Sequence, residues 1–156
     1  MFKLDSEEAL VTAFRPKDRK HVEVIKELQF PMIVTDYVGW VHPSGGRVFL
    51  VFAMPKGPPI GIVFESNGGS GPGVVQMCDW CHSHASGTGV GMLTAKLNSK
   101  KRVGVYACID LSCAQKLEDE ANRSGASPRP AMEKLIQRMG RFASEALGID
   151  LMSPDR

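Results

Sequence analysis

Three apolar segments in the first half of the chain follow the pattern of β-strands. They run from Ile33 to Val41, from Arg47 to Met54 and from Ile60 to Glu65, and they are rich in β-branched and aromatic residues. Turn-forming sequences separate them, His42–Gly46 and Pro55–Pro59. Because short connections join antiparallel neighbours, the pattern predicts an antiparallel meander. The uninterrupted apolar character of the second segment indicates a strand that is buried on both faces.

A second pair of strands is predicted further along the chain. Val90–Leu97 and Arg102–Cys108 flank the polar sequence Asn98–Lys101, which is typical of a hairpin turn. Val74–Met77 is a shorter strand ahead of this hairpin. The second half of the chain therefore also contributes antiparallel strands.

Helical periodicity is clearest from Ala131 to Leu147, and Gly148 follows as a stop signal. The apolar face of this segment consists of Leu135, Ile136, Met139, Phe142, Ala143, Ala146 and Leu147. A short helix is predicted to begin at Asp5 or Ser6 and to end at Arg15, before a proline. Another should run from about Leu111 to Asn122, with Asp110 or Ser112 as its cap.

Three segments carry no regular pattern. Residues 17–29 mix apolar and charged positions so that helix and strand both remain open. Asn67–Gly73 is interpreted as a flexible linker, because its glycines are not followed by the Lys-Ser/Thr of a phosphate-binding loop. His82–Gly89 is interpreted as tight turning, since its glycines do not fit a nucleotide-binding motif.

All four cysteines fall into two close pairs. Cys78 and Cys81 form a CxxC motif, and Cys108 and Cys113 form a CxxxxC motif after an interval of 26 residues. Two close thiolate pairs are the usual ligand set of a structural zinc site, so we predict that these four residues bind Zn²⁺ or a related metal that prefers soft ligands. A knuckle, a hairpin and a helix that supplies the last cysteine follow one another in the order of a treble-clef zinc finger.

Other interpretations of this region are weaker but open. The cysteines could be four unlinked buried thiols, whereas a redox CxxC would need a βαβ pattern around it, which the sequence lacks. His82 and His84 follow the first pair, and we interpret them as surface residues or as neighbours of the ligands. Four thiolates leave no open position for water, so we expect a structural site, no enzymatic activity and no small-molecule substrate.

Composition limits the classes of protein to consider. The chain has 156 residues, of which 43% are hydrophobic and 23% charged, and its formal net charge is +2. This is ordinary for a compact domain, and the charge alone does not indicate nucleic-acid binding. The sequence contains no secretory signal and no apolar stretch long enough to span a membrane. We therefore expect a cytoplasmic protein, in which reduced cysteines favour metal over disulfides.

These elements predict a single α+β domain. We expect a small antiparallel β-sheet joined to a treble-clef zinc finger, with a C-terminal helix packed across it. The expected segments are an N-terminal helical part (1–30), the β-meander (31–73), the treble clef (74–124), and the C-terminal helix with its tail (125–156).

Several sequence blocks together resemble a known family. They are Tyr37–Pro43, Arg47–Val51, Gly61–Phe64, Cys78–Cys81 and Val103–Cys113. With them the chain resembles, from about residue 5 to residue 147, the elongation factor G-binding proteins, whose C-terminal treble-clef zinc-finger domain also occurs in fusidic acid resistance proteins of the FusB type. The cysteine spacing, with its Val-Gly-x-Tyr and Asp-Leu flanks, is the specific part of this resemblance.

The resemblance implies a cytoplasmic bacterial protein that binds translation elongation factor G through its zinc-finger region. It also implies that such a protein promotes release of the factor from a ribosome stalled by fusidic acid. The zinc ligands of the family correspond to Cys78, Cys81, Cys108 and Cys113. The chain departs from the resistance proteins in having only a short helix ahead of the strands, where they carry a sizeable helical domain. Factor binding is therefore a firmer expectation than drug resistance.

Basic residues suggest where a partner binds. Lys96, Lys100, Lys101 and Arg102 lie around one hairpin turn, and further basic residues follow in and before the last helix, namely Arg123, Arg129, Lys134, Arg138 and Arg141. Such residues fit an acidic protein face or ribosomal RNA, although solvation alone also explains them. Trp80 is either a contact anchor or a packed residue beneath the knuckle. An RNA- or ribosome-binding zinc module is therefore the alternative function.

Overall fold

A five-stranded antiparallel sheet forms the centre of the computed structural model, which describes residues 1–68, 71–87 and 89–153. Its strands lie in the order β3-β4-β5-β8-β9. Their bounds are β3 Tyr37–Val41, β4 Arg47–Phe52, β5 Ile60–Ser66, β8 Val90–Lys96 and β9 Arg102–Cys108. The first three follow the chain as the predicted meander, and the predicted hairpin β8–β9 joins through the pairing of Glu65 with Thr94.

Shorter elements surround this sheet. Two small antiparallel pairs are formed by β1 (Phe2–Leu4) with β2 (Met32–Val34), and by β6 (Gly71–Met77) with β7 (His84–Gly87). The helical elements are α1 Glu7–Thr12, the 3-10 helix η1 Arg19–His21, α2 Cys113–Ser124, α3 Arg129–Arg141 and its π-helical continuation η2 Phe142–Ala146. Within the described residues, no helix is long and apolar enough to cross a membrane.

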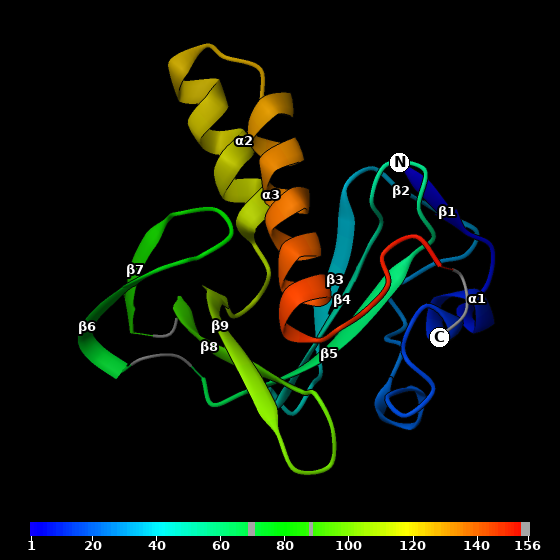
Figure 1. Ribbon diagram of the computed structural model, residues 1–156. Helices are drawn as coiled ribbons and strands as arrows, with labels where there is room; N and C mark the ends of the chain where they lie inside the picture. The colour runs from blue at the N-terminus through cyan, green and yellow to red at the C-terminus, as the bar shows by residue number, and fades with distance from the viewer. Residues whose placement is uncertain (69–70, 88, 154–156) are drawn as a thin grey trace.

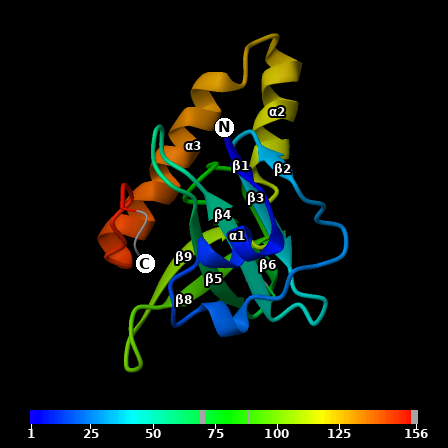
Figure 2. The ribbon, with the colours of Figure 1, turned by 90° about the vertical axis from the view of Figure 1, so that its right-hand side faces the viewer.

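The central sheet has a hydrophobic layer on each face (Figures 1 and 2). Helix α3 covers one face, and α1 with the β1–β2 pair covers the other. Alternate residues of β4 divide between the two layers: Leu50 and Phe52 pack in the layer beneath α3, whereas Phe49 and Val51 pack in the N-terminal layer. The prediction that this strand is buried on both faces is therefore confirmed, because each face has its own cover.

The N-terminal layer is built around one aromatic cluster. The ring of Phe14 meets those of Trp40 and Phe49 edge-on, with centroids 6.4 Å apart in both pairs. Phe14 also lies over Gly61 of β5, where an added Cβ would come within 2.6 Å of the ring. Helix α1 precedes Phe14 and has Ser6 as its N-cap, one of the two predicted positions, whose hydroxyl accepts a hydrogen bond from the Ala9 N–H at 3.1 Å.

The N-terminal half differs from the prediction in two respects. The single strand expected over residues 33–41 is divided into β2 and β3, and β2 pairs with the unpredicted strand β1. Residues 17–29 contain only the short helix η1 as regular structure. A three-residue strand has too short a pattern to be recognised in the sequence. In both places, packing against distant residues decides the conformation.

The interpretation of residues 67–73 and 82–89 as linker and turn is corrected in part. Gly71–Gly73 already belong to β6, which begins earlier than the expected strand Val74–Met77, and β7 lies within the expected turn. Glycine and alanine, two of the four residues of β7, have low strand propensity, so β7 exists through its pairing with β6. The parts of these interpretations that concern residues 69, 70 and 88 lie outside the described residues.

The two later helices confirm the predicted periodicity. Helix α2 begins at Cys113, so this cysteine is in the first helical turn as expected. Ser112, one of the two predicted positions, is the N-cap residue, but its side chain makes no cap hydrogen bond, and the Asp110 carboxylate accepts from the Ser112 N–H. Helix α3 with η2 covers most of the predicted segment 131–147, and Gly148 follows with a positive φ of 67°.

Candidate metal centre

The four cysteine sulfur atoms meet in one buried cluster. All lie within 4.8 Å of one another, and the Sγ atoms of Cys78 and Cys113, like those of Cys81 and Cys108, are 3.7 Å apart. A zinc ion bound at about 2.3 Å from each of four tetrahedral thiolates would separate them by roughly 3.8 Å. The cluster therefore has the dimensions of a structural zinc site, which the four thiols fit in number, type and spacing.

The first cysteine pair is held by a tight backbone turn. The N–H of His82 donates to the carbonyl of Cys78 at 2.8 Å, and the N–H of Cys78 donates to the carbonyl of Ser83 at 2.8 Å. His82 takes a positive φ of 63°, which turns the chain away behind Cys81. The N–H of Cys81 points back to the Cys78 sulfur at 3.4 Å. Hydrogen bonding with Cys108 raises the pKa of Cys78, and the Cys81 N–H acts in the opposite direction by favouring the thiolate.

The second pair joins a strand to a helix. Cys108 is the last residue of β9 and Cys113 is the first of α2. Between them, Leu111 has a positive φ of 56°, and its N–H donates to the Cys108 carbonyl at 2.9 Å. The order of knuckle, hairpin β8–β9 and helix α2 is the predicted treble clef.

Strand β3 supports this second pair across the fold. The Tyr37 hydroxyl donates to the Leu111 carbonyl at 2.5 Å and accepts from the Ala114 N–H at 3.0 Å, so it caps α2 where Ser112 does not. Burial raises the pKa of Tyr37, and the nearby Cys113 raises it further, so the hydroxyl stays protonated. Leu111 packs over Gly39, where an added Cβ would lie 2.5 Å from its side chain. The conformation of the metal-binding loop therefore depends on the sheet.

The four cysteines can all ionise together only if a cation neutralises their charge. Hydrogen bonding from Cys108 and the other two thiols lowers the pKa of Cys81. The same surroundings, with Cys108 again the largest contributor, raise the pKa of Cys113. One thiolate can be stabilised by neighbouring thiols, but four adjacent negative charges repel one another. A divalent metal would relieve this repulsion and allow all four sulfurs to ionise together.

Lys116 is the charged neighbour of the cluster, and the sequence analysis missed it. Its Nζ donates to the Cys108 sulfur at 3.1 Å and lies 3.5 Å from the Ser83 hydroxyl, which is itself 3.1 Å from the Cys81 sulfur. Burial alone would lower the pKa of Lys116, but the interactions with Cys108 raise it overall. The ammonium group therefore stays charged and offsets part of the excess negative charge of a zinc tetrathiolate. The sequence offered one signal for this role: Lys116 lies one helical turn after Cys113, so the two residues share a face of the helix.

Replacing Lys116 should weaken metal binding without removing a ligand. For Lys116→Met we expect zinc affinity to fall about tenfold, because partners of ligating residues contribute at that scale. Lys116→Arg, which retains the charge, serves as the matched control and should stay near the unmodified protein. Competition with a chromophoric chelator measures both. Equal zinc affinity in the methionine variant would show that the ammonium group has no effect on the metal.

The two histidines lie outside the cluster. His82 and His84 are exposed, and among the described residues the four cysteines form the one group with metal-binding geometry. This placement agrees with the interpretation of both histidines as surface or neighbouring residues. A backbone hydrogen bond links the knuckle to the sheet: the N–H of Asp79 donates to the Tyr106 carbonyl at 2.8 Å.

Trp80 is packed beneath the knuckle. Its side chain is 2% exposed and meets the rings of Phe64 and Phe142 at centroid distances of 5.9 and 6.2 Å. Arg138 of α3 donates to the Trp80 carbonyl at 2.7 Å. Of the two roles considered for this tryptophan, the structure agrees with packing, and we remove it from the surface available to a partner.

The predicted basic residues lie far from the metal end of the hairpin. Lys96 and Arg102 pair at the end of β8–β9 opposite Cys108, and Lys100 and Lys101 are exposed in the turn beyond them. Arg102 is paired with Glu65 at 2.5 Å. The metal cluster and these cations therefore occupy opposite ends of one hairpin.

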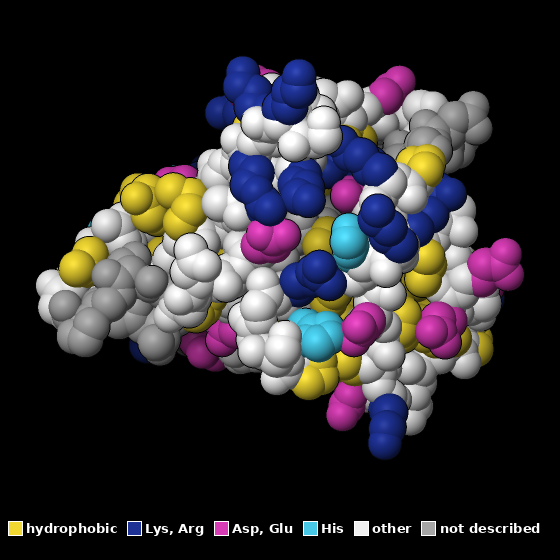
Figure 3. Space-filling view, turned by 90° about the horizontal axis from the view of Figure 1, so that it is seen from below, with side chains coloured by type: hydrophobic (Ala, Val, Ile, Leu, Met, Phe, Trp, Pro, Cys, Tyr) yellow, Lys and Arg dark blue, Asp and Glu magenta, His cyan; other side chains and the backbone are white. Residues whose placement is uncertain are grey.

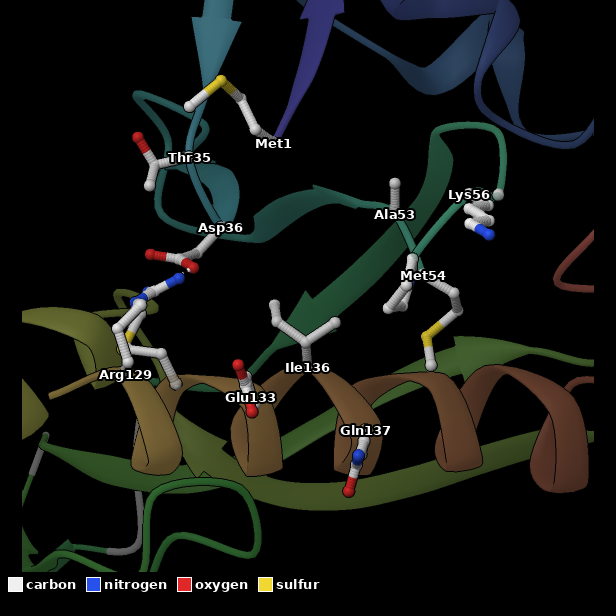
Figure 4. Close-up of a pocket in the computed structure, with 13 residues that line it drawn as sticks. Met1, Thr35, Asp36, Ala53, Met54, Lys56, Arg129, Glu133, Ile136 and Gln137 are labelled. Atoms are coloured by element: carbon white, nitrogen blue, oxygen red, sulfur yellow. Dashed lines mark hydrogen bonds and ion pairs between the residues drawn. The ribbon is translucent and has the colours of Figure 1, made fainter.

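A cavity of about 500 Å³ lies elsewhere, between α3 and the turn after β4 (Figure 4). Met54 and Ile136 contribute apolar surface to it, and Asp36 pairs with Arg129 at 2.7 Å on its wall. None of its lining residues is a cysteine of the metal cluster. The cavity and the candidate metal centre are separate features.

Comparison with known proteins identifies what this arrangement resembles. The model of the FBP C-terminal treble-clef zinc-finger family matches residues 7–147. Among solved structures, that of the fusidic acid resistance protein FusC is similar, with a TM-score of 0.51 and 24% identity over 80% of this chain and 56% of FusC. The chain thus spans little more than half the length of FusC, and the likeness concerns the fold. A comparison with curated proteins finds no match.

The family match bears on three expectations. It confirms the resemblance noted in the sequence, and with the cysteine cluster it confirms the α+β treble-clef fold and a structural zinc site. The roles of individual residues in binding a partner are a separate matter, which the fold does not decide.

Proposed function

The chain belongs to the FBP C-terminal treble-clef zinc-finger family, and from this premise we propose that it is a non-enzymatic cytoplasmic protein that binds translation elongation factor G. The observation that carries the proposal is the buried four-cysteine cluster within a family match that covers residues 7–147. Zinc bound by Cys78, Cys81, Cys108 and Cys113 holds the knuckle and α2 in one arrangement. It shapes a binding surface and leaves no position for a reacting water.

The likeness to the fusidic acid resistance protein FusC concerns the fold and is consistent with the family match. In this proposal the protein binds the factor and promotes its release from the ribosome. A domain that recognises a protein needs a surface rather than a reactive group. The proposal therefore depends on a surface close to the zinc finger.

Exposed apolar side chains lie on the strands next to the finger, and the basic side chains lie on the turn at the far end of the β8–β9 hairpin. Val74, Val75 and Met77 of β6 are exposed, as are Met92 and Tyr106, which pair across β8–β9. Hydrophobic side chains are visible at the projecting end of β6–β7, on the left of Figure 3. Exposed apolar surface of this kind is typical of protein interfaces. We propose that it forms the centre of the contact, with the basic β8–β9 turn at its rim.

The direct test is complex formation with purified elongation factor G. We expect a one-to-one complex in size-exclusion chromatography with light scattering, and we expect it to survive nuclease treatment. Nuclease resistance separates a protein contact from one bridged by RNA. A protein that elutes alone at micromolar concentrations of both components would contradict the proposal.

The basic turn is tested by a triple variant, Lys100→Ala, Lys101→Ala and Arg102→Ala. We expect several-fold weaker binding to elongation factor G, because rim charges mainly accelerate association. Stability should change by less than about 1 kcal/mol, since Arg102 and Glu65 form an exposed ion pair. Titration calorimetry and thermal unfolding measure the two quantities. Unaltered affinity would exclude this turn from the contact.

A further inference from the structure

Segments far apart in the sequence form one positively charged surface, which we call the basic face. Figure 3 shows Lys and Arg side chains gathered on this side of the molecule around histidine. The cations come from the segment after α1, from the start of β4 and from the β8–β9 turn: Arg15, Lys17, Arg19, Lys20, His21, Arg47, Lys96, Lys100, Lys101 and Arg102. The sequence suggested only the last group, because the fold brings the others to it.

Backbone carbonyls hold the segments of the basic face together. Arg15 donates through Nη2 to the Lys96 carbonyl at 2.7 Å, and Lys17 donates through Nζ to the Leu97 carbonyl at 2.5 Å. Arg19 donates to the carbonyls of Phe14 and Thr12, both at 3.0 Å. A carbonyl fixes the position of a cation but does not neutralise its charge. Lys17 and Arg19 are therefore held in position and keep their charge, whereas Arg15 also pairs with Asp18.

Two carboxylates lie at the centre of the face, and each is paired with an arginine, so that Arg47 and Lys96 carry the remaining charge there. Asp18 and Glu65 line a depression of about 40 Å³ there, together with His21, Arg47 and Lys96. Asp18 is 6% exposed and bound to Arg15 at 2.7 Å, and Glu65 is bound to Arg102. Burial lowers the pKa of His21, and Arg47, Lys20 and Lys96 lower it further. The charges therefore converge on one region.

The chemistry of the face favours phosphate over a protein. In the described part of the chain, the exposed large hydrophobic residues all lie outside it: Met1, Ile33, Val74, Val75, Met77, Met92, Tyr106 and Met152. A protein interface uses an apolar or aromatic anchor at its centre, and single-stranded nucleic acid is bound on stacked aromatic rings. The basic face offers neither. Duplex RNA is recognised through its shape and its phosphates.

We propose that the basic face binds the phosphate backbone of double-stranded RNA. The choice of RNA rests on the proposed function at the ribosome, whereas the recognition of phosphate rests on the charges described above. Contacts to phosphate oxygens carry no base sequence, so binding is independent of sequence and sensitive to salt. The basic face would orient the protein on ribosomal RNA while the apolar surface near the zinc finger contacts the factor, with the β8–β9 turn at the boundary between the two.

The test uses a fluorescently labelled RNA duplex of about 16 base pairs, the span of a compact duplex-binding domain. The full chain loaded with zinc should bind it in fluorescence anisotropy, with an affinity that falls steeply as salt rises. In the variant Lys20→Gln, Arg47→Gln and Lys96→Gln, we expect at least tenfold weaker binding. The slope of log affinity against log salt should decrease by about 2 to 3, close to 0.9 for each lost phosphate contact.

A matched control lowers the net charge by the same amount at residues outside the basic face. Lys3→Gln, Lys56→Gln and Lys134→Gln alter exposed residues of β1, of the turn after β4 and of α3, and this variant should bind RNA like the unmodified protein. Absence of duplex binding at about 0.1 M salt, or equal losses in both variants, would overturn the proposal. So would displacement of the duplex by polyglutamate at equal charge concentration, which would identify the face as a site for acidic protein. Elongation factor G is absent from the assay, so failure here leaves the proposed function to its own test.

Discussion

Cys113→Ser is expected to release zinc and to unfold the second half of the protein. Cys113 is fully buried, lies 3.7 Å from Cys78 and forms the first turn of α2. Structural zinc sites contribute about 10–16 kcal/mol of binding energy to folding, which is comparable to or larger than the roughly 5–15 kcal/mol stability of a whole domain. A serine hydroxyl does not ionise to replace the thiolate, so the site loses a ligand and much of this energy.

Zinc content and thermal unfolding measure this effect. We expect less than one zinc per chain after purification and the loss of the cooperative unfolding transition. Ser112→Ala is the matched control: it changes the neighbouring residue, whose side chain makes no cap hydrogen bond, and it should retain zinc. Full zinc stoichiometry with an unchanged melting curve in Cys113→Ser would contradict the structural role of the cluster.

Trp80→Ala is expected to destabilise the protein by about 3–5 kcal/mol, the usual cost of truncating a large buried aromatic residue. The indole fills the space between the sheet and α3, where it contacts Phe64 and Phe142. Its loss leaves a cavity beside the knuckle, because the Arg138 hydrogen bond to the Trp80 carbonyl holds the backbone in place. Chemical denaturation of the zinc-loaded protein measures the change.

A control separates packing from partner contact. Tyr106→Ala removes an exposed aromatic side chain on β9 and should change stability by less than about 0.5 kcal/mol. We expect it to weaken binding to elongation factor G, whereas Trp80→Phe should retain binding. Weaker binding in Trp80→Phe at unchanged stability would restore this residue as a contact anchor.

Local patterns in the sequence were sufficient for most elements of the fold. The apolar runs of β4 and β5, the hairpin around Asn98–Lys101 and the periodicity of α3 predicted the observed elements, because each pattern is long enough to specify one local structure. The short strands β1, β2 and β7 were not predictable. β1 and β2 are only three residues long, and β7 contains alanine and glycine, which are depleted in strands, so pairing with a partner strand determines all three.

The same division applies to the candidate metal centre. The spacing of the four cysteines predicted the ligand set, since two close pairs separated by a hairpin have few other uses. The sequence did not indicate that Tyr37 caps α2 or that Gly39 accommodates Leu111, because more than 70 residues separate these partners. The sequence marked Tyr37 and Gly39 only as part of the block Tyr37–Pro43, which contributes to the family resemblance but gives no physical role for either residue.

By itself, the sequence indicated the candidate ligands, the longer strands and helices and the resemblance to a family, since these depend on residue type and spacing. Only the tertiary structure decided that Trp80 is packed inside, that Lys116 lies against Cys108 and that residues 15–21 complete a basic face with the β8–β9 turn. Burial and charge at a surface depend on which distant segments meet. That information is distributed over the whole chain and appears only when the two layers pack on the sheet.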